Sequence, residues 1–268
     1  MFLSTKFFIP RHLLTMSLAM AATQYSWAID SINESDWKDT YLSVGTGYIQ
    51  KSSIYLNAEN KSSQYVSIDA YWGPMFFIDY KIGTYFSEYN NWAFSLSYGL
   101  DNREDTDRGD SKILKDLPNL GSIFLASINA ELHHDAGDLA INYSIDTSNE
   151  HNGKMIDIDY SYPWIINKHT VSFELSANWI SKEVSQYYYG VNAADTKENR
   201  PSYELKDEIN WSYGLNYSYY IRPNIFSSAS IVFNNLSNGI KNSPIVEKPN
   251  SNSLLFGINY IFQLLQGA

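Results

Sequence analysis

Alternating hydrophobic and polar residues are the strongest pattern in this chain, and the alternation is clearest between residues 209 and 221. One set of alternate positions is apolar and mostly aromatic: Ile209, Trp211, Tyr213, Leu215, Tyr217, Tyr219 and Ile221. The positions between them are small and polar: Asn210, Ser212, Gly214, Asn216 and Ser218. Successive side chains of a strand point to opposite faces. The stretch therefore predicts a strand with one apolar face and one face suited to a confined, wet interior.

The length of this strand and its aromatic ends indicate that it crosses a membrane. A transmembrane strand takes about 9–11 residues, with an apolar lipid-facing set and aromatic side chains near both interfaces. Similar alternation gives eleven candidate strands in all: residues 41–49, 64–72, 76–86, 92–100, 122–132, 137–147, 154–162, 171–179, 209–221, 224–236 and 253–262. We predict an all-β fold, specifically a transmembrane antiparallel up-and-down β-barrel.

An odd number of candidates implies that one strand is missed, because single-chain bacterial barrels contain an even number. The ambiguous region is 37–63, where Ile54, Tyr55 and Leu56 stand between polar stretches. We predict that this region contributes two strands, giving a total of twelve, with ten as the alternative.

Proline marks two predicted turns, because it cannot donate a hydrogen bond to a sheet ladder. One turn is at Gly73-Pro74 and the other at Pro163-Trp164. From Trp92 onward, short and long connections alternate, as periplasmic turns and external loops do. The longest predicted external loops are Asp101–Leu120 and Ser181–Glu208.

The first 28 residues have the features of a secretory signal peptide. Lys6 and Arg11 form a basic region, a short apolar run follows, and Ser26 and Ala28 suit a cleavage site. The run is shorter than the roughly 20 apolar residues that a membrane-spanning helix needs. We predict a signal peptide at residues 1–28 and one outer-membrane barrel domain at residues 29–268.

Composition and charge agree with export and argue against nucleic acid. The chain holds 22 Tyr, 13 Phe, 7 Trp and no Cys, and its 29 acidic residues outnumber 19 Lys and Arg. An acidic protein is repelled by the phosphate backbone. Outer-membrane lipid is the predicted environment.

Three carboxylates fall on the polar faces of their strands: Asp157, Asp159 and Glu174. Turning them to lipid would cost free energy, so they are expected to face the lumen. Two interpretations remain open. The carboxylates could line a cation-preferring pore, or they could belong to a packed polar plug of paired charges, for example with Lys81.

No arrangement of residues predicts catalysis or a cofactor. His133-His134-Asp135 lies in a tight turn and lacks a second group of ligands, whereas a metal site needs three or four that converge. His169 with Ser172 and Ser176 does not bring a nucleophile and a base together. We therefore expect a non-enzymatic protein with no catalytic, cofactor or metal residues.

Several motifs in the C-terminal third carry a family resemblance. They are the run Tyr187–Ala194, which includes Tyr188, Tyr189 and Gly190, the Pro201–Tyr203 stretch, the block Ser243, Pro244, Ile245 and Val246, and the closing Phe256–Phe262. The chain resembles the MipA/OmpV family of outer-membrane proteins, the MltA-interacting proteins. The Tyr187–Tyr189 cluster is open to two interpretations, a ligand or partner surface or an aromatic girdle at the barrel rim, and we predict the girdle.

The resemblance implies a location in the outer membrane of a Gram-negative cell. It also implies a scaffold that links murein hydrolase and murein synthase, with a lytic transglycosylase and a penicillin-binding protein as partners. Two alternatives are a small-molecule or ion channel with an acidic lumen, and an adhesin that acts through the external loops.

Overall fold

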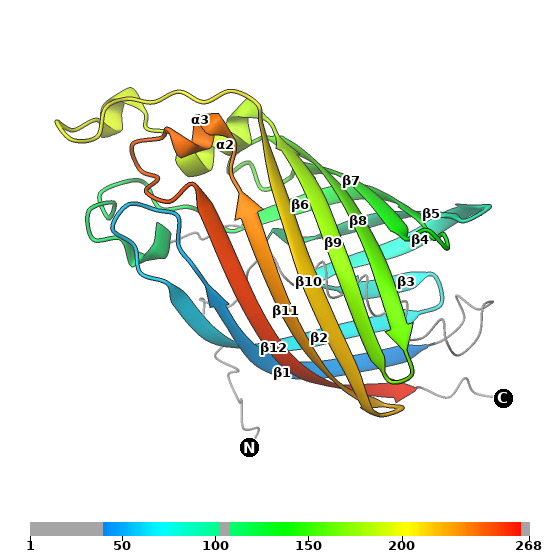
Figure 1. Cartoon of the computed structure of the whole chain (residues 1–268). Helices are drawn as coiled ribbons and strands as arrows, with labels where there is room; N and C mark the ends of the chain where they lie inside the picture. Colours follow the sequence, from blue (N-terminus) through cyan, green and yellow to red (C-terminus); the bar gives the residue numbers. More distant parts are fainter. Residues whose placement is uncertain (1–39, 102–107, 264–268) are drawn as a thin grey trace, which may run out of the picture.

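The computed structural model describes residues 40–101 and 108–263, which form a closed antiparallel β-barrel of twelve strands (Figure 1). The strands are β1 (Tyr41–Lys51), β2 (Lys61–Trp72), β3 (Met75–Ile78), β4 (Lys81–Tyr89), β5 (Trp92–Asp101), β6 (Ile123–Leu132), β7 (Asp138–Asp146), β8 (Lys154–Ile166), β9 (His169–Ile180), β10 (Glu208–Arg222), β11 (Ile225–Asn235) and β12 (Asn250–Gln263). Each strand pairs with its neighbours in sequence, and β1 closes the ring on β12. The predicted fold class and the number of twelve strands are confirmed.

Within residues 40–101 and 108–263, helical segments are few and short. They are η1 (Arg108–Asp110), α2 (Lys182–Tyr189), η2 (Ala193–Asp195) and α3 (Asn238–Lys241). In the described part of the chain, no helix has the length and apolar character needed to cross a bilayer. The predicted signal peptide at residues 1–28 and the first residues of the predicted barrel domain lie outside the described residues.

The two ends of the barrel differ in their connections. One end, the turn end, carries short connections at residues 73–74, 90–91, 133–137, 167–168 and 223–224. The other end, the loop end, carries longer connections at 52–60, 102–122, 147–153, 181–207 and 236–249. The predicted alternation of short and long connections is confirmed. Outer-membrane barrels place short turns in the periplasm and long loops outside the cell.

The twelfth strand arises at a different place from the one predicted. The predicted strand 76–86 is divided into β3 and β4 by a turn at Asp79 and Tyr80, whose φ angles are 52° and 61°. The region 37–63 does not divide. In it, the described residues hold β1, a loop with one isolated bridge between Tyr55 and Val246, and the start of β2.

The predicted turn at Pro163-Trp164 is wrong, because β8 continues to Ile166 and turns at Asn167. Pro163 pairs with Ser172 of β9, whereas the pairing of β8 with β7 ends at Ser161. At Pro163 the strand therefore has a neighbour strand on one side alone. Proline is tolerated at such an edge, since no ladder hydrogen bond is lost there.

Strand β10, which contains the alternating stretch 209–221, has the predicted apolar outward face and small, polar inward face. On β10, Leu215 is 50% exposed and Asn216 is 5% exposed, and the other outward residues are again apolar or aromatic. Inward-facing glycines on β1 allow side chains of neighbouring strands to approach closely. A Cβ at Gly45 would lie 1.7 Å from Asn259 Oδ1, which accepts a hydrogen bond from Ser67 Oγ at 3.0 Å.

Candidate functional site

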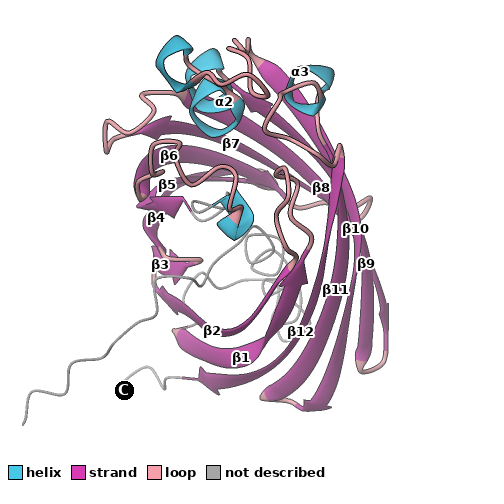
Figure 2. Cartoon of the chain, turned by 90° about the vertical axis from the view of Figure 1, so that its left-hand side faces the viewer, coloured by secondary structure: helices cyan, strands magenta, loops and turns pink. Residues whose placement is uncertain are grey.

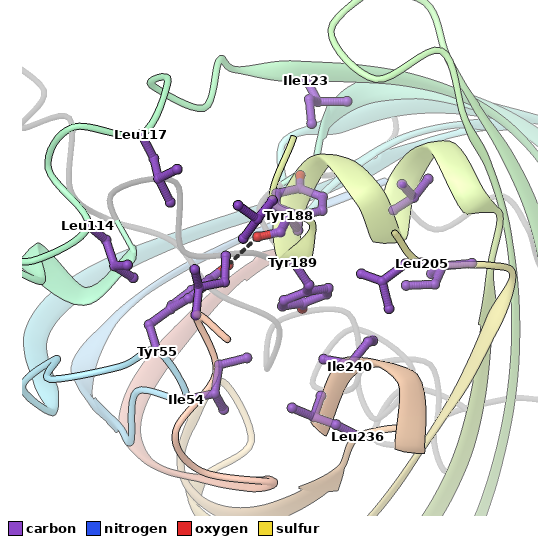
Figure 3. Close-up of a cluster of buried hydrophobic side chains, with 14 of the residues drawn as sticks. Ile54, Tyr55, Leu114, Leu117, Ile123, Tyr188, Tyr189, Leu205, Leu236 and Ile240 are labelled. Atoms are coloured by element: carbon purple, nitrogen blue, oxygen red, sulfur yellow. Dashed lines mark hydrogen bonds between the residues drawn. The ribbon is translucent and has the colours of Figure 1, made fainter. Parts of the chain in front are cut away.

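The largest hydrophobic core of the protein lies at the loop end. This loop-end core contains Ile54, Tyr55, Leu114, Leu117, Ile123, Leu125, Met155, Ile180, Val184, Tyr188, Tyr189, Val191, Leu205, Leu236, Ile240 and Ile245. Figure 3 shows part of this core. Four separate connections contribute to it, and Ile123, Leu125, Met155 and Ile180 come from barrel strands. Figure 2 looks onto this end and shows loops and a short helical turn lying within the ring of strands. Packed loops therefore occupy the mouth of the barrel.

Helix α2 supplies the centre of this core. Its buried residues Val184 and Tyr188 are four positions apart, as are Ser185 and Tyr189, so they share one side of the helix. The helix ends at Tyr189 and is followed by the cap residue Gly190, whose amide donates to the Gln186 carbonyl at 2.9 Å. A Cβ at Gly190 would lie 2.5 Å from the backbone carbonyl oxygen of Gln186, which explains the glycine at this position.

The two family motifs, far apart in sequence, pack against each other in the loop-end core. Ser243 Oγ donates to the Tyr189 carbonyl at 2.6 Å, and Ile245 is fully buried. The β1–β2 loop joins them, because Leu56 N donates to the Ile245 carbonyl at 2.9 Å and Tyr55 pairs with Val246. Pro244 connects Ser243 to Ile245 in this contact.

The interpretation of Tyr187–Tyr189 as a membrane girdle is wrong. Tyr188 and Tyr189 are each 2% exposed and pack in the loop-end core. Tyr187 packs against the same core, and its hydroxyl accepts a hydrogen bond from Gly121 N at 2.7 Å. Aromatic content alone could not distinguish a girdle from a core, since both are rich in tyrosine.

A buried arginine in the β9–β10 connection forms an ion pair with an aspartate in the β5–β6 connection. Arg200 is 4% exposed, and its guanidinium donates to both carboxylate oxygens of Asp116, at 3.1 and 2.5 Å. Lys197 adds an ion pair to Asp116 at 2.8 Å. Hydrogen bonds from Arg200, and then from Lys197, hold the pKa of Asp116 well below its usual range. These residues could not be predicted from the sequence, because no local pattern indicates which loops meet.

The three predicted lumenal carboxylates lie on β8 and β9. Glu174 is 3% exposed, while its neighbours Phe173 and Leu175 are 37% and 43% exposed. Asp157 lies opposite Asn178, whose Nδ2 donates to Asp157 Oδ1 at 2.5 Å, and Asp159 lies opposite Ser176. The three carboxylates therefore alternate with outward-facing residues, as expected of side chains that face the lumen. Their role in a pore or a plug stays a prediction, as does a pairing with Lys81, which lies on β4 opposite Gly99.

The two histidine groups considered for chemistry have ordinary structural contacts. His133 Nδ1 lies 3.1 Å from Asp138 Oδ1, and His134 Nδ1 accepts from Ala136 N at 3.0 Å in the β6–β7 turn. Across residues 40–101 and 108–263, no three His, Cys, Asp or Glu side chains form a group that could hold a metal ion. His169 is exposed and contacts Tyr217 at 2.8 Å, whereas Ser172 of the same strand is buried.

The family is settled by comparison with known proteins. The family model described as MltA-interacting protein MipA matches residues 44–262, nearly the whole barrel. The chain belongs to the MipA family. It is an outer-membrane β-barrel protein, so the predicted family and location are confirmed.

The similar relatives are distant. The outer membrane protein YiaT of Escherichia coli K12 is 22% identical over 226 residues, which cover 82% of this chain and 91% of the relative. The MltA-interacting protein of the same strain is 22% identical over 204 residues, covering 76% of this chain and 71% of the relative.

Solved barrels show a weaker likeness. A bacterial polysaccharide outer membrane secretin has a TM-score of 0.44 with 6% identity, covering 86% of this chain and all of the other. OmpT of Vibrio cholerae has a TM-score of 0.40 with 8% identity, covering 86% and 99%.

Proposed function

We propose that this MipA-family barrel is a non-enzymatic scaffold that links a murein hydrolase, a lytic transglycosylase, to a murein synthase, a penicillin-binding protein. The relative from Escherichia coli K12 that bears the name MltA-interacting protein supports the first of these partners. The second partner follows from the family resemblance of the sequence motifs.

The observation that carries this proposal is the loop-end core. Sixteen buried hydrophobic residues from loops and strands pack together at the mouth of the barrel, and both family motifs contribute to them. An open pore would need a polar, water-filled path through this end. A scaffold needs no such path, and a rigid closed barrel suits it better.

The partners would meet the turn end. Periplasmic enzymes can reach only the short turns and the segments that flank them, because the rest of that end lies in the membrane. The exposed side chains available there include Trp72, Tyr89, Asn90 and Lys168. Short turns and their flanking residues offer a small contact area, which fits a transient interaction rather than a permanent one.

Complex formation between purified components tests the proposal. The refolded protein in detergent is mixed with a lytic transglycosylase, a penicillin-binding protein, or both, and complexes are separated by size-exclusion chromatography. We expect the two enzymes to co-elute only when the barrel is present. The scaffold proposal is contradicted if neither enzyme co-elutes with the barrel. It is also contradicted if only one of the two enzymes co-elutes with the barrel in every mixture.

A second candidate is a cation-preferring channel, favoured by the inward parity of Asp157, Asp159 and Glu174. Conductance of the protein in planar bilayers separates the two functions. A scaffold closed by the loop-end core gives no steady single-channel current. A steady, cation-selective current that is reduced in Glu174→Gln would favour the channel.

A further inference from the structure

One arginine at the loop end buries its positive charge without a carboxylate to balance it. Arg108, in η1, is 8% exposed. Its Nη1 donates to the Pro118 carbonyl at 2.9 Å, within the same β5–β6 connection. Among the described residues this is its only hydrogen bond, and its Nε is buried without a partner. A guanidinium remains charged in proteins, so a buried cation is held here by a single neutral carbonyl.

The other buried arginine of the loop end shows what such a group requires. Arg200 is 4% exposed and makes a bidentate contact with the carboxylate of Asp116, and it also donates to the Asp195 carbonyl. Asp116 is already shared between Arg200 and Lys197. Within residues 40–101 and 108–263, no carboxylate forms an ion pair with Arg108. Of the two buried arginines, Arg108 is therefore the one that needs a counter-charge.

The surroundings of Arg108 do not replace that counter-charge. Tyr55, Tyr187, Asp195 and Arg200 are the ionisable groups around it. Burial lowers the pKa of the Arg108 guanidinium, and the charge of Arg200 lowers it further, whereas the other three groups favour the charged form. The pKa remains lowered after all these effects, so the protein environment disfavours the charge. A buried charge in such a position is costly unless an opposite charge pairs with it.

The turn that carries Arg108 is fixed against the β1–β2 loop. Its three residues, Arg108–Asp110, have φ angles of 48°, 68° and 55°, in the left-handed region that non-glycine residues seldom adopt. A Cβ at Gly109 would lie 2.6 Å from Ser53 Oγ, which shows how closely the two connections approach. On the other side of the turn, Ser111 Oγ donates to the Leu56 carbonyl at 2.6 Å. A turn fixed in this way holds the Arg108 side chain in its buried position.

The unused donors of Arg108 fit an anion that has two oxygens. Pro118 engages Nη1, which leaves the edge formed by Nε and Nη2 without a protein acceptor in the described part of the chain. Two parallel N–H groups on one edge of a guanidinium match two oxygens of a carboxylate or a phosphate. The side chain of Asp110, in the same turn, is 78% exposed, so the turn itself lies at the outer surface of the loops.

We propose that the loop end binds a small free oxyanion, phosphate or a simple carboxylate, on the Nε–Nη2 edge of Arg108. The anion supplies the counter-charge that the described residues do not provide. The β1–β2 loop, α2 and the β9–β10 connection all reach this arginine, through Tyr55, Tyr187 and Asp195. Because the anion binds the packed loops and not the unpacked ones, its binding stabilises the loop-end core. This site is separate from the partner contacts proposed at the turn end.

Isothermal titration calorimetry tests the site, with inorganic phosphate as the probe. The refolded protein is kept in lipid-free detergent, and the ionic strength is held constant with chloride. We expect saturable binding of phosphate that Arg108→Met weakens by about tenfold or more, because two charge-assisted hydrogen bonds are lost. The matched control is Lys112→Met, which removes the same charge from an exposed position of the same connection and should change the affinity by less than about threefold.

Absence of saturable phosphate binding to the wild type, or equal affinities of the wild type and Arg108→Met, would overturn the proposal. Binding that appears only after phosphatidylglycerol is added would also overturn it, because the anion would then be a lipid head group and not a free solute. Slower mobility after heating, measured on gels for each variant, verifies that the barrels compared are folded.

Limited proteolysis of the 102–122 connection with proteinase K separates the anion site from a purely structural role of Arg108. In chloride alone, Arg108→Met should be cut no faster than the wild type, because an apolar side chain replaces a buried charge that has no counter-ion. Phosphate should then slow cutting of the wild type and leave Arg108→Met unchanged. Faster cutting of Arg108→Met in chloride, with the same response to phosphate as the wild type, would mean that Arg108 serves only to hold Pro118, and would contradict the proposal.

Discussion

The hydroxyl of Ser243 donates a hydrogen bond to the carbonyl of Tyr189 at 2.6 Å, and so joins two family motifs that are 54 positions apart. Ser243 is 3% exposed and Tyr189 is 2% exposed, so water cannot replace the bond. The motifs shared with the family therefore build the core of the loop end. They do not lie at the membrane surface.

The first prediction concerns this bond. Ser243→Ala leaves a buried carbonyl without its donor, which costs about 1–3 kcal/mol. We expect the 236–249 connection to be cut faster in limited proteolysis, with the strands intact. Ser202→Ala is the control, because its hydroxyl donates to the Val191 carbonyl at 3.2 Å from an exposed position. Equal cleavage of the two variants would mean that the Ser243 bond is not needed for packing.

The second prediction concerns Ile245, which is fully buried between the β1–β2 loop and α2. Ile245→Ala should destabilise the loop-end core by about 2–5 kcal/mol and Ile245→Val by about 0.5–1.5 kcal/mol, because a larger deletion leaves a larger cavity. Urea unfolding in detergent micelles, followed by tryptophan fluorescence, measures the difference. An alanine variant as stable as the valine variant would contradict the packing seen at this position.

The barrel could be predicted from the sequence because it is specified by a local pattern, the alternation of apolar and polar residues along each strand. Alternation along a strand such as 209–221 is repeated in nearly every strand, and each repeat is visible without knowing its neighbours. The position of the twelfth strand was not visible. Asp79 and Tyr80 adopt positive φ without glycine or proline, so the sequence from Phe76 to Phe86 gives no turn signal at the point where the strand divides.

The loop-end core could not be predicted, because its contacts join residues far apart in the chain. Tyr55, Tyr189 and Ile245 come from three connections that have no shared periodicity. Family resemblance identified two of the three segments but gave no reason for them to touch.

The third prediction concerns the pH range over which Arg200 and Asp116 stay paired. The folded pKa of Asp116 is lowered by the hydrogen bonds from Arg200 and Lys197. A lowered pKa adds stability at pH values above the ordinary carboxyl pKa of about 3.9, and this stability is lost only as the pH falls through the lower folded value. Proteolysis of the 181–207 connection by a protease active in acid should therefore be the same at pH 7 and pH 4.5.

Asp116→Asn provides the comparison, because it keeps the size of the side chain and removes its charge. Arg200 then remains buried without its ion pair, and the connection should be cut faster at both pH values. Faster cleavage of the wild type at pH 4.5 alone would show that Asp116 is protonated there and that its pKa is not lowered.

The fourth prediction concerns the register of β9. Leu175 is 43% exposed and Glu174 is 3% exposed, so an arginine should be costly at the first position and a neutral amide mild at the second. Leu175→Arg near the middle of the membrane should cost about 2–4 kcal/mol, whereas Glu174→Gln keeps the shape of the side chain. Folding yield, measured by heat-modifiable mobility on gels, compares them. Equal folding yields of the two variants would mean that the inward and outward faces of β9 are wrongly assigned.

The last prediction uses cysteine labelling on β10 to connect the fold to the proposed function. Cysteine replaces Leu215 or Asn216 in a chain that has no natural cysteine, so each label reports one position. Leu215→Cys, on the outward face, should react with a lipid-soluble maleimide and resist a charged, water-soluble one. Asn216→Cys, on the inward face, can be reached from outside the cell only through the mouth of the barrel. Because the loop-end core lies in that mouth, the proposed scaffold predicts that Asn216→Cys resists the water-soluble reagent in intact cells. Rapid labelling there would favour the channel over the scaffold, and water-soluble labelling of Leu215→Cys would overturn the membrane-facing assignment of this strand.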